Sequence, residues 1–323
     1  MLFIVGMTRG GNTWLGKIFD AHPDVLYRHE PDSILKTKAV PAFCGDQDVE
    51  RYLPAAKEYF DAVLRVRTSK AIGTFPVLPK SYHSYPQHQL KRAMVLGVKG
   101  FEKLGFFSRF FRDLPLPEMT GQAPVHHVAK SIAALGRMNL FSRLYPDAKI
   151  VLLLRHPGGQ VASALKAIAS DKIDGQPPAT EDWGIYEDLA ETDLGRRQGL
   201  TLTDFKAFDP VERLAWRWAI SNDKALEDLD GRQNVQVVLY EDLCRSPVAV
   251  SKSLFAFAGL DWHPAVESFV QRSSTANESE TYDRVIRDSA KTASAWRRKL
   301  EPGKIELIDK VLERSRAGKY YQG

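Results

Sequence analysis

The sequence predicts an α/β fold in which helices cover both faces of a central parallel sheet. Short apolar runs with the β-branched content of buried strands recur along the chain, and segments with helical spacing separate them. A glycine-rich loop follows the first apolar run and leads into a helix, as in P-loop proteins. Strands that alternate with helices in this way form a parallel sheet between two layers of helices. We therefore expect one P-loop NTPase-like, three-layer domain that spans residues 1–323.

The composition indicates a globular protein with an anionic ligand. Of the 323 residues, 44% are hydrophobic and 26% are charged, and the net charge is +5. That charge suits an anion but is too small to indicate nucleic acid binding. No apolar run approaches the roughly 20 residues of a membrane span, and the start at Met1 lacks the charged segment of a signal peptide. Cys44 and Cys244 form neither a disulfide framework nor a zinc motif. We expect a cytoplasmic protein without a transmembrane segment, while its oligomeric state stays open.

The first element is predicted as a buried strand at residues 2–5, a short apolar run. After it, Gly6, Gly10 and Gly11 can take positive φ angles and let the backbone approach a ligand closely. A helix is expected from Asn12, because the apolar residues that follow have helical spacing. A glycine-rich loop at a helix N-terminus presents backbone N–H groups to an anion.

The spacing of this loop, Gly6-x4-Gly11-Asn12-Thr13, is that of the P-loop motif G-x4-G-K-[ST] with Asn12 in place of the lysine. Without that lysine, a site for ATP or GTP loses its main cation. Arg9 can supply positive charge from within the loop. We therefore expect the loop to bind a 5′-phosphate-like anion without hydrolysing a nucleoside triphosphate.

The following elements continue the alternation as far as residue 145. We expect strands at 24–27, 93–98 and 125–128 and helices at 46–65 and 101–112. A further helix is expected after residues 130–131 and should end near 145, and residues 82–89 should form a loop.

The second half of the chain begins with the clearest parallel strand, a continuous apolar run at 149–154. Pro157 suits the first turn of the helix that follows this strand. Residues 168–208 are polar and partly acidic, so we expect an inserted lid or acceptor loop there. The remaining elements are helices near 211–229, 246–258 and 302–315 and a last strand at 235–239.

Several polar residues lie just after predicted strand ends, so we expect them to converge on one crevice at the carboxyl edge of the sheet. They are the loop 6–13, Glu30, Lys130, Arg155 and Glu241. Arg155 and Ser163, which lies in the following helix, are within reach of one phosphate. Arginine at this strand end also argues against a nucleoside triphosphatase, which needs a magnesium-binding aspartate there.

Four segments of the chain resemble the sulfotransferases that use 3′-phosphoadenosine 5′-phosphosulfate (PAPS). Arg9-Gly10-Gly11-Asn12-Thr13-Trp14-Leu15 resembles their 5′-phosphosulfate loop. Residues 151–157, followed by Ser163, look like their 3′-phosphate motif. Residues 20–25, followed by Glu30-Pro31, resemble the carbohydrate and tyrosyl-protein branches, and residues 240–243 are similar to a strand-end motif of the family. The resemblance covers residues 2 to about 260 in the family's order.

This resemblance implies in-line transfer of a sulfuryl group from PAPS to a hydroxyl group, with 3′-phosphoadenosine 5′-phosphate (PAP) as the product. The acceptor is expected to be a small molecule or a glycan. More specifically, we expect a carbohydrate or a glycolipid. The residues that it implies for the nucleotide are Arg9, Gly10, Gly11, Asn12, Thr13 and Trp14 at the 5′ end and Arg155 and Ser163 at the 3′-phosphate. No metal is required, because protein cations take the place of magnesium.

The resemblance also implies the catalytic residues. Glu30 matches the position of the catalytic glutamate in the resembling branches, and His29 beside it is the competing base. Lys130 is expected to contact the leaving group and the sulfonate. Arg9 is expected to bind the 5′-phosphosulfate together with the N–H groups of the loop.

The sequence departs from the family pattern in several places. Asn12 and a second glycine replace the more usual Ser/Thr-rich loop, and His156 stands where Asp is common. The glycine-rich C-terminal nucleotide segment of the cytosolic steroid and phenol enzymes is not evident. Trp296 and Arg297 are expected to take a nucleotide or acceptor role instead. The membrane anchor of Golgi members is not evident either, which indicates a soluble, bacterial enzyme.

Two other functions stay open. The first is a P-loop kinase or another nucleoside triphosphate enzyme, against which Asn12 and the missing strand-end aspartate argue. The second is a non-catalytic nucleotide- or glycan-binding protein, in which Glu30 and Lys130 would be dispensable.

Overall fold

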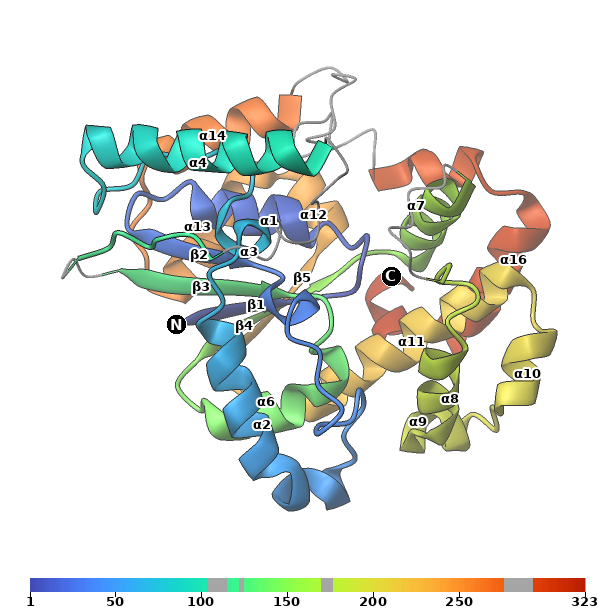
Figure 1. Cartoon of the computed structure of the whole chain (residues 1–323). Helices are drawn as coiled ribbons and strands as arrows, with labels where there is room; N and C mark the ends of the chain where they lie inside the picture. The colour runs from blue at the N-terminus through green and yellow to red at the C-terminus, as the bar shows by residue number, and fades with distance from the viewer. Residues whose placement is uncertain (104–114, 122–124, 170–176, 276–292, 323) are drawn as a thin grey trace.

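The computed structural model describes all residues except 104–114, 122–124, 170–176, 276–292 and 323. Within this part, five strands form one all-parallel sheet with the order β2-β3-β1-β4-β5 (Figure 1). The strands are β1 (Leu2–Val5), β2 (Val25–His29), β3 (His126–Ser131), β4 (Lys149–Leu154) and β5 (Val235–Leu239). β1 lies in the centre of the sheet, so the glycine-rich loop that follows it lies at the middle of the carboxyl edge.

Helices cover both faces of this sheet, because the side chains of each buried strand alternate between the faces. One face packs against α2 (Val49–Leu64), α6 (Met138–Leu144) and α11 (Pro210–Asp228). The other packs against α1 (Asn12–Asp20), α13 (Pro247–Ala258) and α14 (Pro264–Thr275). In Figure 1 the second group lies above the sheet and α2 and α6 lie below it. The predicted three-layer α/β fold is therefore confirmed.

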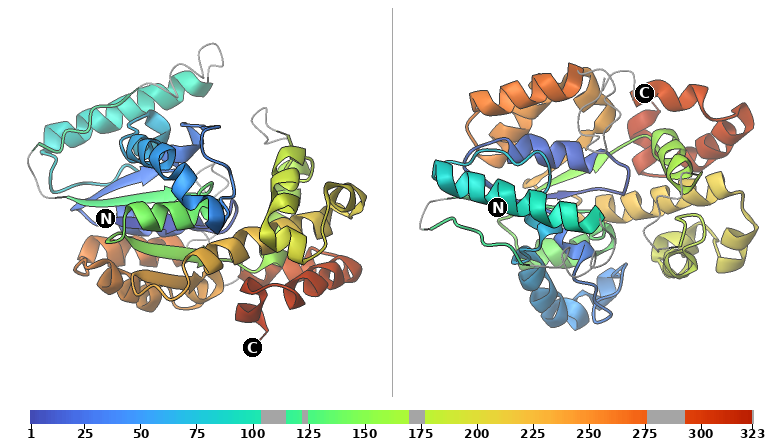
Figure 2. Two further views of the ribbon diagram at one scale, coloured as in Figure 1. Left: turned by 90° about the horizontal axis from the view of Figure 1, so that it is seen from below. Right: turned by 45° about the horizontal axis from the view of Figure 1, so that its top comes forward.

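The remaining helices flank the sheet and the helices that cover it, as the two further views show (Figure 2). They are α3 (Ser69–Ile72), α4 (Tyr85–Lys103), α7 (Pro157–Ala169), α8 (Trp183–Glu191), α9 (Asp193–Arg197), α10 (Leu202–Ala207), α12 (Tyr240–Arg245) and α16 (Pro302–Glu313), with short 3₁₀ turns that include Ala295–Arg298 and Ala317–Tyr321. Among the residues that the structure describes, no helix has the length and apolar content needed to cross a membrane.

The strand predicted at 93–98 is wrong, because this segment lies inside α4. Val95 and Val98 are buried while Leu96 is 51% exposed, which is the spacing of a helix and not of a strand. A short apolar run fits either period, and here the helix also includes the predicted loop residues from Tyr85 onward. The helix expected at 101–112 coincides with the end of α4 at its start and otherwise lies outside the described residues.

The loop conformation expected for the lid or acceptor segment 168–208 is wrong for its described part, which folds into α8, α9 and α10, while the role of the segment stays a prediction. Tyr186, Leu189 and Phe205 of these helices are fully buried and belong to the same hydrophobic core as one face of the sheet. Thr201 and Asp204 form a capping box at the start of α10. The polar composition of the segment reflects the exposed faces of short helices, which concealed their few buried positions.

Candidate functional site

The carboxyl edge of the sheet brings together the segments that the sequence singled out. The loop 6–11 follows β1, Glu30 follows β2, Arg155 follows β4, and Lys130 is the penultimate residue of β3. β2 and β3 are each longer than expected, because their polar ends still pair in register, His29 beside Lys130.

The glycine-rich loop is folded tightly around its own backbone. The amide of Gly10 and the side-chain Nδ2 of Asn12 both donate to the carbonyl of Met7, at 3.0 and 2.6 Å. Arg9 and Gly11 have positive φ angles of 63° and 92°. Such angles are strained for arginine and favourable for glycine, so the loop holds Arg9 in an uncommon conformation. The Arg9 side chain is exposed at the tip of the loop.

The start of α1 presents open N–H groups to the crevice. In the described part of the chain, the amides of Gly11, Asn12 and Thr13 have no hydrogen-bond acceptor. The unpaired amides of a helix N-terminus, with the positive end of its dipole, form an anion site. This observation fits the predicted 5′-phosphosulfate loop.

Two side chains of the loop motif point inward and not toward a ligand. Asn12 is 3% exposed, and its Oδ1 has no partner among the described residues, so its side chain supports the loop from within. Trp14 is 7% exposed and donates from Nε1 to the hydroxyl of Ser273 at 2.9 Å. The Asn12 side chain is therefore turned away from the predicted nucleotide site, and Trp14 ties the helix that carries the loop to α14.

Arg155 is buried at the end of β4 and faces the glycine loop. It is 8% exposed, and its Nη1 donates to the carbonyl of Arg9 at 2.8 Å. In the part of the chain that the structure describes, Arg155 forms no ion pair, and its Nε has no hydrogen-bond partner. The charge of Arg155 partly offsets the burial that raises the pKa of Glu241, but no carboxylate of the described residues lies within ion-pair distance of the guanidinium, so the site fits a bound phosphate. Ser163 lies half-buried two turns along α7.

Trp296 packs against the residue that follows Arg155. Its ring stacks on His156 with a centroid distance of 4.5 Å, and an added Cβ at Gly158 would come within 2.4 Å of the same ring. Arg297 lies over the Trp296 ring at 4.5 Å and is itself exposed. Burial, and then the charge of Arg297, lower the pKa of His156 to about 4. Both predicted C-terminal residues thus lie beside the 3′-phosphate motif, with Trp296 buried and Arg297 accessible.

The proposed catalytic pair is in direct contact. Lys130 Nζ forms an ion pair and hydrogen bond with Oε1 of Glu30, and Lys130 is 1% exposed. In the described part of the chain, Oε2 of Glu30 has no hydrogen-bond partner. Burial alone would raise the pKa of Glu30, but the charge of Lys130 outweighs it and holds this pKa below its ordinary value. Glu30 is therefore ionised at neutral pH.

His29 lies beside this pair, and its imidazole ring is held in the neutral form. Its Nε2 is 3.8 Å from Oε1 of Glu30, and its Nδ1 shares a hydrogen bond of 3.1 Å with the hydroxyl of Tyr27. Burial, and then the charge of Lys130, lower the pKa of His29 to about 3. The ring is therefore neutral at pH 7 and a weak base.

The sequence analysis missed two residues at this corner. Asp32 is 5% exposed, accepts a hydrogen bond from Ser131, and has a pKa that burial raises. Lys70 lies near enough for its charge to lower the pKa values of Glu30 and His29. The position of Asp32, two residues after Glu30, was a usable signal, whereas Lys70 reaches the site only through the packing of α3 against β2.

A cavity of about 240 Å³ lies between the 41–48 loop, the α8–α9 corner and the end of α11. Its lining includes Asp46, Asp48, Asp188, Glu191, Asp193, Glu227 and Asp228 against two cations, Arg196 and Lys224. Asn222 Nδ2 contacts the sulfur of Met7 in the glycine loop at 3.4 Å. At a rise of about 1.5 Å per residue, Asp228 lies about 9 Å further along α11 than this contact with the glycine loop.

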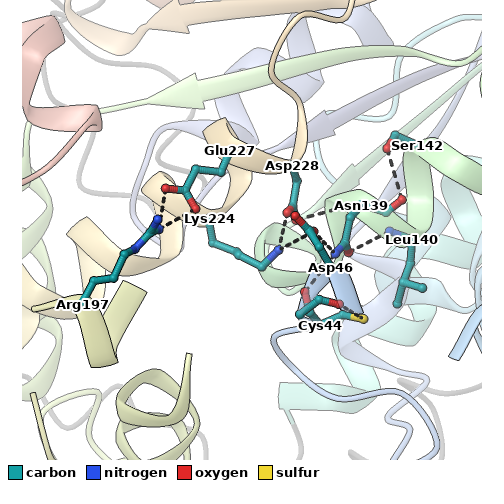
Figure 3. A network of polar contacts seen from close by, with 10 residues as sticks. Cys44, Asp46, Asn139, Leu140, Ser142, Arg197, Lys224, Glu227 and Asp228 are labelled. Atoms are coloured by element: carbon teal, nitrogen blue, oxygen red, sulfur yellow. Dashed lines mark hydrogen bonds and ion pairs between the residues drawn. The ribbon is translucent and has the colours of Figure 1, made fainter. Parts of the chain in front are cut away.

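Ion pairs and hydrogen bonds join the walls of this cavity (Figure 3). Lys224 pairs with Asp228 on its own helix and lies 3.8 Å from Asp46 of the loop. Asn139 Nδ2 donates to Asp46 at 3.0 Å. Cys44, which also lines the cavity, is fully buried, and burial raises the pKa of its thiol to about 11. Among the described residues, no cluster of three or more His, Cys, Asp or Glu side chains could hold a metal ion.

Comparison with known proteins gives consistent matches. A family model described as the sulfotransferase family matches residues 2–264. Carbohydrate sulfotransferase 5 of Mus musculus is 23% identical over 339 residues, which cover 96% of this chain and 78% of that protein. Carbohydrate sulfotransferase 6 of Homo sapiens is 23% identical over 337 residues, with 96% and 78% covered.

Solved structures show distant similarity. The sulfotransferase domain from the curacin biosynthetic pathway has a TM-score of 0.47 and 14% identity, covering 97% of each chain. Mouse sulfotransferase SULT7A1 complexed with PAP has a TM-score of 0.44 and 13% identity, covering 99% of this chain and 88% of that one.

Proposed function

The chain belongs to the sulfotransferase family, whose enzymes use PAPS, and from this premise we propose that it transfers the sulfuryl group of PAPS to a hydroxyl of a carbohydrate or glycolipid. The observation that carries the nucleotide assignment is the buried Arg155, which forms no ion pair among the described residues, has an unpartnered Nε and faces the loop with open amides. Two anion sites at one edge suit a nucleotide with phosphates at both its 3′ and 5′ positions.

In this proposal the glycine loop and Arg9 bind the 5′-phosphosulfate, and Arg155 and Ser163 bind the 3′-phosphate. Glu30 takes the proton of the acceptor hydroxyl at Oε2. The acceptor oxygen forms a bond to sulfur as the bond between sulfur and the 5′-phosphate oxygen breaks. Lys130 and Arg9 stabilise the negative charge that develops on the leaving phosphate. His29, neutral and bonded to Tyr27, positions Glu30.

For the acceptor, the proposal rests on the names of the relatives and on the cavity beside the crevice. We propose that the helices within 168–208 form the acceptor side of a single domain and that the protein is cytoplasmic. The curated relatives above are carbohydrate sulfotransferases. Seven carboxylates and two cations on the cavity wall disfavour a polyanionic glycan, so we expect an uncharged acceptor.

The test is transfer of labelled sulfate from PAPS across matched acceptors: a neutral oligosaccharide, the same chain with a uronic acid, and a neutral glycolipid. We expect transfer to a neutral hydroxyl acceptor by the wild type, and none by Glu30→Gln. Magnesium-dependent turnover of ATP, with no sulfate transfer to any acceptor, would overturn the proposal in favour of a kinase.

A further inference from the structure

We infer that Tyr240 is a positioning residue that holds the Arg155 guanidinium against the glycine loop and so sets the preference for a nucleotide with a 3′-phosphate. The inference rests on the proposed function, because it takes Arg155 as the 3′-phosphate ligand. Tyr240 is the first residue of α12, directly after β5, and is 6% exposed.

The ring of Tyr240 contacts both nucleotide segments. The guanidinium carbon of Arg155 lies 4.6 Å from the ring centroid. On the other segment, an added Cβ at Gly11 would lie 2.3 Å from Cδ2 of the ring, so only glycine leaves room for it. Trp14, one turn into α1, meets the same ring edge-on at a centroid distance of 6.3 Å. Tyr240 thus packs against Arg155 and against the start of the helix that carries the loop.

Arg155 has few other supports. One guanidinium nitrogen, Nη1, donates to the carbonyl of Arg9, and Nε is buried without a partner among the described residues. A carboxylate partner would hold the guanidinium firmly but would also compete with phosphate for it. An aromatic face attracts the cation and leaves its N–H groups available, since those groups lie in the plane of the guanidinium.

The expected consequence is preorganisation. An arginine that is free to rotate must lose its rotamer freedom when phosphate binds, which weakens binding. The Tyr240 ring restricts that freedom before the nucleotide arrives. The effect should be specific for the 3′-phosphate, because the 5′ end is bound by backbone amides of the loop.

The hydroxyl of Tyr240 has a separate partner. It forms a hydrogen bond with the thiol of Cys244, one turn along α12. The ring face and not the hydroxyl should therefore matter for Arg155, which predicts different results for Tyr240→Phe and Tyr240→Leu.

The experiment measures, by calorimetry, the affinities for PAP and for adenosine 5′-phosphate, which lacks the 3′-phosphate. The matched control is Tyr59→Leu, because Tyr59 carries the same kind of stack, with the Arg137 guanidinium carbon at 5.2 Å from its ring, on α2 and away from the nucleotide segments. Tyr240→Leu should reduce the preference for PAP by about 5- to 30-fold. Tyr240→Phe and Tyr59→Leu should keep the wild-type preference.

A wild type that binds both nucleotides equally would refute the assignment of Arg155 and thus the proposed nucleotide site. Given a wild-type preference, equal losses of both affinities in Tyr240→Leu would overturn the inference alone, since the ring would then only support the core. In an Arg155→Ala background, Tyr240→Leu should not change the preference further, and a further loss would also overturn it. If Tyr240→Leu does not fold, Tyr240→Met gives the same comparison.

Discussion

Glu30 and His29 are adjacent candidates for the base that takes the proton of the acceptor hydroxyl, and their surroundings shift their pKa values differently. Lys130 holds the pKa of Glu30 below its ordinary value, whereas burial and Lys130 lower the pKa of His29 to about 3. A carboxylate that is ionised but pairs with a lysine can accept a proton once the lysine turns toward the sulfonate. A neutral imidazole with so low a pKa cannot hold one at pH 7.

We therefore predict that Glu30→Gln retains PAP affinity and loses turnover by about 10²- to 10⁴-fold, since it removes the base and leaves the anion sites in place. Initial rates with labelled PAPS and calorimetry with PAP measure the two quantities. His29→Asn is the control and should keep most of the turnover. If His29→Asn is inactive and Glu30→Gln is active, the two roles are exchanged.

His156 gives a prediction for stability against pH. Its folded pKa of about 4 lies below the ordinary value of 6.5, because burial and the charge of Arg297 disfavour the protonated ring. The folded state thus prefers neutral His156, and the stability that this adds is present above pH 6.5 and is lost as the pH falls toward 4. Over pH 7 to 4 the loss should be about 3 kcal/mol from this residue.

Urea unfolding of the wild type and of His156→Asn, between pH 7 and pH 4, measures this effect. Asparagine can accept the hydrogen bond that His156 Nδ1 takes from the Gly158 amide at 3.1 Å, but it does not titrate. The unfolding free energy of the variant should therefore fall less steeply with acid. Parallel pH profiles for the two proteins would show that folding does not lower the pKa of His156.

Among the elements, α11 connects the crevice to the C-terminal helices. Trp218 Nε1 donates to the carbonyl of Arg155 at 2.9 Å, and Asn222 contacts the glycine loop. On the opposite side, Asp223 accepts hydrogen bonds from the Ser315 hydroxyl at 2.8 Å and from the amides of residues 316 and 317 at 3.0 and 2.7 Å. One carboxylate thus holds the turn that follows α16.

We predict that Asp223→Ala destabilises the protein by about 2–5 kcal/mol, because it leaves several buried donors without an acceptor. Urea unfolding measures the loss, and limited proteolysis should show earlier cleavage after α16. The control is Asp230→Ala, which removes a solvent-exposed ion pair with Arg316 and should not change the unfolding midpoint. Equal effects of the two substitutions would contradict the assigned role of Asp223.

The sequence was most informative where one physical signal dominates. β1, β4 and β5 were predicted at their observed bounds, because each is a short run rich in apolar and β-branched residues. The signal was strongest for β1 and β4, which are buried inside the sheet, whereas β5 is a half-buried edge strand. The sequence was misleading at 93–98, where a five-residue apolar run fits both periods, and at 183–207, where short helices bury few positions. The secondary structure of those segments depends on packing against elements that are distant in the sequence.

In the candidate site, too, some features could be predicted from the sequence and others could not. The rule that ligands bind at the carboxyl ends of parallel strands was enough to place Glu30, Lys130 and Arg155 at one edge. The directions of the Asn12 and Trp14 side chains could not be predicted, because they depend on Met7 in the folded loop and on Ser273 in α14. A loop motif predicts which backbone groups face the ligand, but it does not predict which side chains point away from it.

For the whole molecule, we predict that PAP stabilises the fold and that ATP with magnesium does not. PAP at about 100-fold above its Kd should add about 2.7 kcal/mol, which corresponds to a rise of about 4 °C in Tm for a chain of this length. Thermal melting with each nucleotide at matched concentration measures the difference. Arg155→Ala should lose most of the shift with PAP. An equal shift with ATP and magnesium would support the kinase alternative.

The two buried cysteines make this chain convenient for site-specific labelling. Neither Cys44 nor Cys244 forms a disulfide, and burial raises the pKa of each thiol to about 11. At pH 7 only about one in ten thousand of these thiols is ionised, so a maleimide dye would react far faster with an exposed cysteine. Fluorophores attached at Leu96→Cys on α4 and Arg196→Cys on α9, on opposite sides of the molecule, would then follow nucleotide binding by energy transfer without removal of either native cysteine.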